Sequence, residues 1–255
     1  MGLDIYAGTL TRYYARNWKT AVQQWGERNG VQINMIRQNE KADEEVVPPE
    51  EILQDVTAWR DQLIMNLGDN LKEKLSWKED IDETPYYTDK PDWDALAALL
   101  LYSVCKFTRQ EVPEDFPKNY NVFDSEIYKG FKERKTIAFS LFDCDGWWLP
   151  INDAFMFQYT LPTGHQRVLA TLGMLKVELQ AINSLEWNAD EETILRWSEE
   201  EGYPTDAIWG KDKKPQFLER HDVYNTVSLA KFAFSILWQA VKHSEQHGTL
   251  IIYDF

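Results

Sequence analysis

The end of the chain constrains the fold more than any other segment. Residues 249–255, TLIIYDF, are apolar at their centre and follow Gly248, which closes a long helical pattern. An exposed tail of this composition would leave its apolar side chains in water, so we expect it to pair inside a sheet. The first apolar segment, Leu3 to Leu10, alternates as a strand does, and we predict that these two segments lie side by side.

Helical periodicity occupies most of the remaining sequence. Apolar residues recur every three or four positions, which predicts helices over residues 12–28, 49–66, 93–107, 125–135, 164–184, 190–201 and 216–247. The segment 93–107 is apolar on nearly every side, so we expect it to be central. Its start offers Asp92 or Asp94 as an N-cap, and the helix over 190–201 offers Asn188 or Asp190.

Short apolar runs between turn residues predict further strands. We expect strands over residues 31–37, 137–142, 147–151 and 154–161, with the last three forming a small antiparallel meander. The expected fold class is therefore α+β, as a mostly helical single globular domain over residues 1–255. Its small antiparallel or mixed sheet should include both chain termini.

Two acidic loops interrupt this pattern, near residues 39–51 and 77–94. Both contain several carboxylates and a pair of prolines, and the second also contains Tyr86 and Tyr87. We interpret them as candidate insertions into the single domain. Carboxylates mixed with aromatic rings suit recognition of a basic protein surface, although charge runs more simply keep a protein soluble. The candidate partner-binding residues are Glu44, Glu45, Asp80, Asp82, Tyr86 and Tyr87.

Charge narrows the classes of partner. Asp and Glu number 42 against 27 Lys and Arg, which gives a formal net charge of −15. Such a field repels nucleic-acid phosphates and anionic membranes and attracts basic partners, so we expect neither nucleic acid nor membrane as a partner. Cys105 and Cys144 form no CxxC pair, and residues 1–10 do not resemble a secretory leader, which predicts a cytoplasmic location.

Metal-binding patterns are weak in this sequence. Asp143 and Asp145 flank Cys144, a spacing that can share one divalent cation, but other Asp-x-Asp spacings occur and Asp145-Gly146 also reads as a turn. His243 and His247 are spaced i and i+4, which can serve zinc, yet imidazoles are also favoured at a helix C-terminus. No phosphate-binding loop or dinucleotide motif occurs, and we expect no cofactor.

Catalytic candidates gather near two predicted helix starts. His221 and Asp222 belong to the densest polar cluster, while His165 and Arg167 should open the helix over 164–184, where free N–H groups can bind an anion. Salt-bridge networks and capping explain the same residues. An enzyme would need one cleft that joins these residues with two aspartates, namely Asp143, Asp145, His165, Arg167, His221 and Asp222.

Three kinds of function remain open, because no motif specifies a reaction. The first is a protein-binding module that acts on a basic partner, as an inhibitor or a toxin-neutralising immunity-type protein does. The second is an enzyme with the polar cleft described above. The third is a structural subunit of a larger assembly, which would require a large exposed apolar patch.

Overall fold

The computed structural model describes residues 2–33, 47–68, 71–72, 75–134, 138–204, 207–209, 215–217 and 222–255. The chain divides into two compact units. Unit 1 comprises Met1–Lys90, Phe139–Glu178 and Gln239–Phe255, and unit 2 comprises Pro91–Ala138 and Leu179–Trp238.

A mixed sheet is the centre of unit 1. Within the described residues it has six strands, in the order β2 (Tyr87–Asp89), β1 (Asp4–Gly8), β10 (Leu250–Asp254), β4 (Trp147–Leu149), β6 (Gln166–Thr171) and β5 (Met156–Thr160). Only β4 and β6 pair in parallel among these neighbours, and every other neighbouring pair is antiparallel. The predicted α+β class is confirmed.

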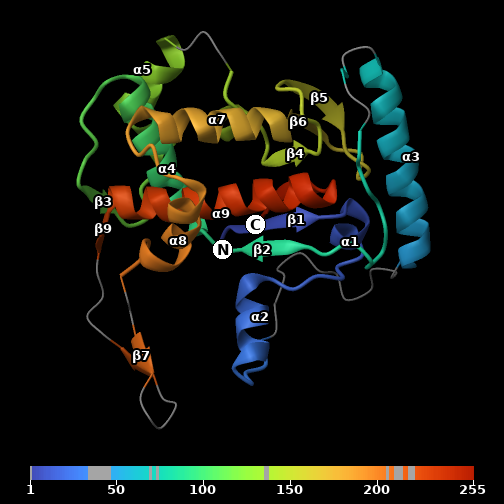
Figure 1. The fold of residues 1–255 in the computed structure, drawn as a ribbon, viewed down its shortest axis with the longest axis horizontal. Helices are drawn as coiled ribbons and strands as arrows, with labels where there is room; N and C mark the ends of the chain where they lie inside the picture. The colour runs from blue at the N-terminus through green and yellow to red at the C-terminus, as the bar shows by residue number, and fades with distance from the viewer. Residues whose placement is uncertain are drawn as a thin grey trace. The chain divides into compact units, whose positions relative to one another are not determined.

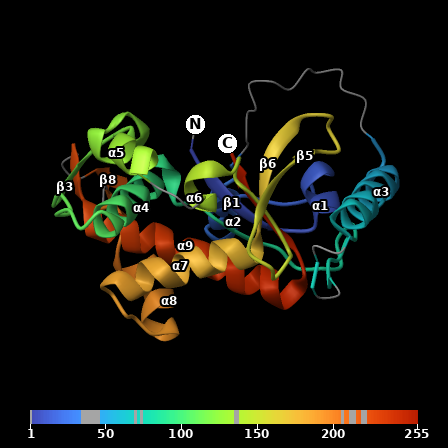
Figure 2. The same ribbon diagram turned by 90° about the horizontal axis from the view of Figure 1, so that it is seen from above.

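The two ends of the chain pair as predicted. In the antiparallel register of β1 and β10, Asp4 lies opposite Asp254 and Tyr6 lies opposite Ile252. Every residue of β1 is buried, and so are the first three residues of β10. The chain ends lie side by side in both views of the ribbon (Figures 1 and 2).

The predicted helix over 12–28 is wrong, because the chain turns in its middle. Helix α1 (Leu10–Tyr14) ends where Arg16 adopts a left-handed conformation with φ of 56°, and the Asn17 N–H then bonds to the Arg12 carbonyl. Thr20 starts a second helix, α2 (Ala21–Arg28), by exchanging hydrogen bonds with Gln23 in a capping box. Apolar periodicity continues across this turn, which is why the sequence resembles one helix.

Helix α3 (Pro49–Leu67) confirms the predicted helix over 49–66 and begins with a proline in its first turn. It packs against α1, and Figures 1 and 2 show the two helices adjacent at one side of unit 1. Residues 31–33 are described and form no strand, and the rest of the predicted strand over 31–37 lies outside the described residues.

The predicted antiparallel meander is also wrong. Ser140–Asp143 forms a short helix, α6, instead of a strand, because the Glu178 carboxylate accepts hydrogen bonds from the Ser140 and Leu141 N–H groups at its start. Residues 166–171, predicted as the start of a helix, form strand β6, which makes a hairpin with β5 and a parallel pair with β4. Helix α7 (Leu172–Leu185) begins only after this strand.

Loop 77–94 contains strand β2 at the edge of the sheet, although its prolines suggested irregular structure. Helix α4 (Asp92–Phe107) has Pro91 at its N-cap position, so the predicted N-cap at Asp92 or Asp94 is wrong. Asp94 accepts a hydrogen bond from the Asn119 N–H at 2.8 Å, and the Tyr203 hydroxyl accepts one from the Ala95 N–H of the first turn at 3.0 Å. Helix α8 (Glu191–Glu200) is capped by Asp190, one of the two residues predicted for this role.

Unit 2 is built around α4, whose residues from Ala95 to Cys105 are almost all buried. A cluster of stacked and edge-on rings fills the unit, with Trp187 at 4.4 Å from Tyr102 and 5.3 Å from Phe234 between ring centroids. Its other elements are β3 (Asp115–Pro117), η2 (Val122–Asp124), α5 (Glu126–Arg134), β7 (Ala207–Trp209), β8 (Pro215–Phe217) and β9 (Val223–Asn225).

Helix α9 (Thr226–His247) starts ten residues later than residue 216, where the sequence predicted it. Strand β9, which pairs with β3, occupies residues 223–225, and the Thr226 N–H bonds to the Glu114 carbonyl at 2.9 Å. Gly248 ends α9 with φ of 65°, as predicted. None of the helices in the described part of the chain combines the length and apolar composition needed to cross a bilayer.

Candidate functional site

The two metal-candidate aspartates of unit 1 accept hydrogen bonds from backbone N–H groups. Asp143 accepts a bond from the Phe139 N–H at 2.9 Å, within the first turn of α6. Asp145 accepts one from the Val168 N–H at 2.7 Å and thereby holds β6 beside the turn before β4. No group of three or more His, Cys, Asp or Glu side chains gathers closely enough to hold a metal in the part of the chain described.

His165 and Arg167 do not open a helix, which corrects their predicted position. His165 lies in the turn between β5 and β6, where its Nδ1 is 3.2 Å from the Thr163 hydroxyl, and Arg167 is exposed on β6 opposite Tyr159. The anion-binding helix start proposed for them is therefore absent at this place.

The remaining cleft residues belong to different units or lie outside the described residues. Asp222 belongs to unit 2, whereas Asp143, Asp145, His165 and Arg167 belong to unit 1. His221, together with Glu44 and Glu45 of the first acidic loop, lies outside the described residues. The six-residue catalytic cleft stays a prediction.

His243 and His247 face each other on α9, with ring centroids 4.5 Å apart. His243 Nε2 is 3.0 Å from the Pro85 carbonyl oxygen, and its ring lies 6.2 Å from that of Tyr87. Burial is the main cause that lowers the pKa of His243, which favours a neutral ring. These contacts attach the end of α9 to the loop before β2.

The second acidic loop directs several of its carboxylates inward. Glu79 accepts four hydrogen bonds, from the Leu10 and Thr11 N–H groups, the Thr11 hydroxyl and the Trp77 indole. Burial raises the pKa of Glu79 despite these bonds. Asp80 bonds the Thr84 N–H and hydroxyl through its two oxygens. Glu79 therefore holds the loop against α1, while the Asp80 carboxylate fixes the turn of the loop itself.

The tyrosines of this loop are only partly exposed. Tyr86 stacks on Tyr6 at 6.0 Å, and its hydroxyl accepts a hydrogen bond from the Lys19 N–H at 3.0 Å. The Tyr87 hydroxyl donates to Asp89 at 3.3 Å. Asp82 is exposed, and it lines the same small pocket as Tyr86. Of the predicted partner-binding residues that are described, Asp82 is the one with a free approach from solvent.

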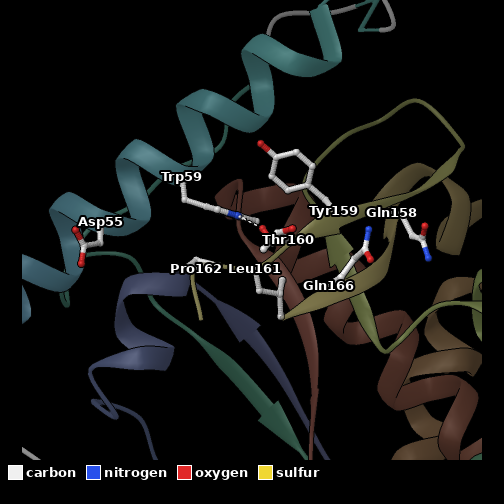
Figure 3. Close-up of a pocket in the computed structure, with 8 residues that line it drawn as sticks. All are labelled: Asp55, Trp59, Gln158, Tyr159, Thr160, Leu161, Pro162 and Gln166. Atoms are coloured by element: carbon white, nitrogen blue, oxygen red, sulfur yellow. Dashed lines mark hydrogen bonds between the residues drawn. The ribbon is translucent and has the colours of Figure 1, made fainter. Parts of the chain in front are cut away.

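A larger groove lies between α3 and the β5–β6 hairpin, wholly within unit 1. Its volume is about 630 Å³, in the range of small-ligand and peptide side-chain pockets. Figure 3 shows Trp59 reaching from α3 towards β5, with Asp55 one helical turn earlier along the same helix. The lining residues are Asp55, Trp59, Gln158, Tyr159, Thr160, Leu161, Pro162 and Gln166. We call this the α3–β5 groove.

Both aromatic walls of the α3–β5 groove are fixed in place. The Trp59 indole donates to the Thr160 carbonyl at 2.7 Å, shown as the dashed line in Figure 3, and the ring meets Trp77 edge-on at 5.8 Å. The Tyr159 hydroxyl accepts a hydrogen bond from the Asn66 amide at 2.9 Å. The rings of Trp59 and Tyr159 lie 6.1 Å apart. The groove therefore exists without a ligand to shape it.

Carboxylates continue along α3 beyond the groove. Glu51, Asp55 and Trp59 are spaced four residues apart, so they occupy one face of the helix. Glu51 and Asp55 are exposed. None of the groove residues was among the site residues predicted from the sequence, although the i, i+4 spacing of Glu51, Asp55 and Trp59 was a visible signal.

Glu178 is a buried carboxylate that supports α6. It is 5% exposed and accepts hydrogen bonds from the Ser140 N–H, the Ser140 hydroxyl and the Leu141 N–H. Burial raises its pKa to about 7, against the lowering effect of these bonds. The Ser140 oxygen also accepts a bond from the Trp148 indole at 2.8 Å. This network is a buried cap at the start of α6, because the carboxylate accepts the first N–H groups of that helix.

The cysteines are unsuited to nucleophilic chemistry. Burial raises the pKa of the Cys144 thiol to about 12, and the N–H groups of Gly146 and Trp147 only partly oppose it. Burial likewise raises the pKa of Cys105. The sequence predicted a poor nucleophile at Cys144 from its neighbouring aspartates, but burial is the larger cause.

Comparison with known proteins adds no functional information. A scan against protein-family models, a search of curated proteins and a search of solved structures each returned no match.

Proposed function

We propose that the protein binds a basic segment of a partner protein in the α3–β5 groove. One observation carries this proposal. The residues that line the groove include two aromatic rings, one carboxylate and two side-chain amides, and no Lys or Arg is among the lining residues that the structure describes. A groove of this composition favours a cation over an anion.

The groove offers a cationic side chain two kinds of attraction. The faces of Trp and Tyr attract a guanidinium or ammonium group, by about 0.5–1 kcal/mol at exposed sites and more when water is excluded. Asp55 lines the groove from the helical turn before Trp59, and Glu51 lies one turn before Asp55 on the same helix. A Lys or Arg inserted beside Trp59 would therefore meet a ring and a carboxylate together.

Long-range charge supports the same type of partner. With a net charge of −15, the protein attracts basic molecules from a distance and accelerates their encounter. The groove would then supply the local selectivity that net charge alone does not give. An inhibitor or immunity-type protein acting on a basic partner is the biological role that we propose for this binding.

The fixed walls also favour binding, because ordering flexible side chains on association costs free energy. Trp59 is held by its hydrogen bond to the Thr160 carbonyl and Tyr159 by its bond from Asn66. Little further ordering of these two rings is needed when a partner arrives.

The test is a fluorescence-anisotropy titration with a labelled, extended Lys/Arg peptide at low and moderate salt. The groove variant carries Glu51→Lys and Asp55→Lys, two exposed positions of α3. The matched control carries Glu199→Lys and Glu200→Lys, two exposed positions at the end of α8 in unit 2. Both variants change the net charge equally, so their difference isolates the groove from the overall field.

We expect the groove variant to bind the peptide about tenfold more weakly than the control variant, as two lost charge contacts imply. Equal weakening in both variants would show that the peptide senses only net charge, and would sink the proposal. A basic protein captured from cell extract would be purified and put through the same comparison, because capture by an acidic protein does not by itself locate a site.

A further inference from the structure

A second pocket of unit 1 has the opposite character from the α3–β5 groove. It lies between the end of α1, α2 and loop 77–94, with a volume of about 490 Å³. Its lining residues are Arg12, Arg16, Asn17, Trp18, Lys19, Gln24, Glu27, Asp82 and Tyr86. Three of these are cationic and two are anionic, which gives a positive balance inside a strongly acidic protein. We call it the Arg12 pocket.

Arg12 is the central feature of this pocket. The residue is 7% exposed, and its Nε is buried without a hydrogen-bond partner among the described residues. Its guanidinium carbon lies 5.1 Å from the centre of the Tyr86 ring. No carboxylate of the described chain forms an ion pair with it. A buried guanidinium without a close anion is costly, so the site is prepared for one.

Two acidic groups of loop 77–94, Glu79 and Asp80, are already engaged by other partners, whereas Asp82, which lines the pocket, is exposed and forms no ion pair with Arg12 among the described residues. Glu79 has its four hydrogen bonds from Leu10, Thr11 and Trp77, and Asp80 is bonded to Thr84 through both oxygens. These carboxylates balance the Arg12 charge only at longer range. They do not supply the paired oxygens that a guanidinium binds side by side.

Lys19 lies at the solvent side of the Arg12 pocket. Its ammonium group forms an ion pair with Glu27 at 2.5 Å, and both side chains are more than half exposed. Exposed pairs of this kind contribute little to stability, so Lys19 can exchange Glu27 for another anion at small cost. Arg16 and Asp82, also exposed, complete the charged groups around the opening.

We propose that the Arg12 pocket binds a small organic molecule through its phosphate group. The Arg12 guanidinium donates hydrogen bonds to the phosphate oxygens, and Lys19 contributes its charge from the solvent side. Arginine suits this role because its planar donors match phosphate geometry. Trp18 and Tyr86 provide apolar wall for the organic part of the ligand. This proposal is independent of the α3–β5 groove, which differs in its residues and in the charge of its ligand.

The experiment is isothermal titration calorimetry of the full chain at low ionic strength, with inorganic phosphate and phenyl phosphate as probes. We expect saturable binding at one site, with phenyl phosphate the tighter ligand. Arg12→Met should weaken binding roughly tenfold or more, the effect of losing hydrogen bonds to a charged group. Equal affinity for the two probes would overturn the assignment to an organic phosphate.

A second pair of variants keeps the test valid if Arg12→Met does not fold. Lys19→Glu reverses a charge at the pocket, and Lys129→Glu is its matched control. Lys129 lies on α5 of unit 2, is also exposed and forms an ion pair with Glu126 at 2.9 Å. We expect Lys19→Glu to abolish measurable phosphate binding and Lys129→Glu to leave it nearly unchanged. Equal effects of the two reversals, or no saturable binding to wild type at millimolar phosphate, would overturn the proposal.

Discussion

Glu178 makes the stability of unit 1 depend on pH in a direction unusual for a carboxylate. In an unfolded chain its pKa is near 4.5, and burial raises it to about 7 in the folded protein. Between these values the folded state binds the proton more strongly than the unfolded state does. The contribution of Glu178 to the free energy of unfolding therefore falls as pH rises from about 4.5 to 7, and is constant above that range.

The size of this effect follows from the difference between the two pKa values. A difference of one in pKa corresponds to about 1.36 kcal/mol, so a rise from 4.5 to about 7 corresponds to about 3 kcal/mol. Glu178 is nearly buried, so solvent screening reduces this figure little. Other carboxylates titrate in the same range, and Glu79, with its raised pKa, acts in the same direction.

Urea unfolding of wild type and Glu178→Gln between pH 5 and pH 8 isolates the contribution of Glu178. The variant is less stable at pH 5, by about 1–3 kcal/mol, because the amide group faces the Ser140 N–H and leaves that donor unbonded. Gln does not titrate, so the stability advantage of wild type should shrink by about 3 kcal/mol towards pH 8. A difference that stays constant over this range would refute the reasoning.

Three further predictions concern single side chains. Thr20→Ala removes the capping box of α2 and should lower the free energy of unfolding by about 1 kcal/mol in urea titrations; no change would contradict the capping role. Gly248→Ala should cost at least about 2 kcal/mol, because φ is 65° and the new Cβ would lie 1.9 Å from the Ser76 carbonyl oxygen; a wild-type midpoint would contradict this. Cys144, with its raised pKa, should react with a thiol reagent at pH 8 only when the protein unfolds; rapid reaction in the native state would show the thiol to be accessible.

The pairing of the chain ends was predictable because its cause is local and strong. Residues 250–252 are apolar and buried, and pairing inside a sheet both removes them from water and satisfies their backbone groups. The helices α3, α4 and α8 were also predictable from local features. Their apolar residues recur at helical spacing, α3 begins with a proline, and Asp190 caps α8.

The wrong predictions concern segments whose structure cannot be read from apolar periodicity. The pattern over 12–28 continues through a turn that Arg16 makes in the left-handed region, where few non-glycine residues are found. Residues 166–171 resemble the start of a helix, but they pair with β5 on one side and with β4 on the other. Parallel pairing of β6 with β4 joins segments that are distant in the sequence, so no pattern within residues 166–171 reveals it.

The candidate sites were only partly visible in the sequence. The spacing of Asp55 and Trp59 placed a carboxylate and a ring on one helix face, but Tyr159 joins them from a strand about a hundred residues later. The Arg12 pocket likewise depends on loop 77–94 folding back over α1. The composition of that loop predicts a partner-binding surface, but most of its described carboxylates bond to the protein itself.

The most direct test of the proposed function follows the Trp59 indole by two-dimensional NMR. Its N–H signal, assigned with the Trp59→Phe variant, should shift progressively as the basic peptide is added, because the ring forms a wall of the α3–β5 groove. The signal of Trp93, an exposed tryptophan of unit 2, should stay in place. Binding in the groove would be contradicted if saturating peptide shifted the signal of Trp93 or other residues and left the Trp59 signal unchanged.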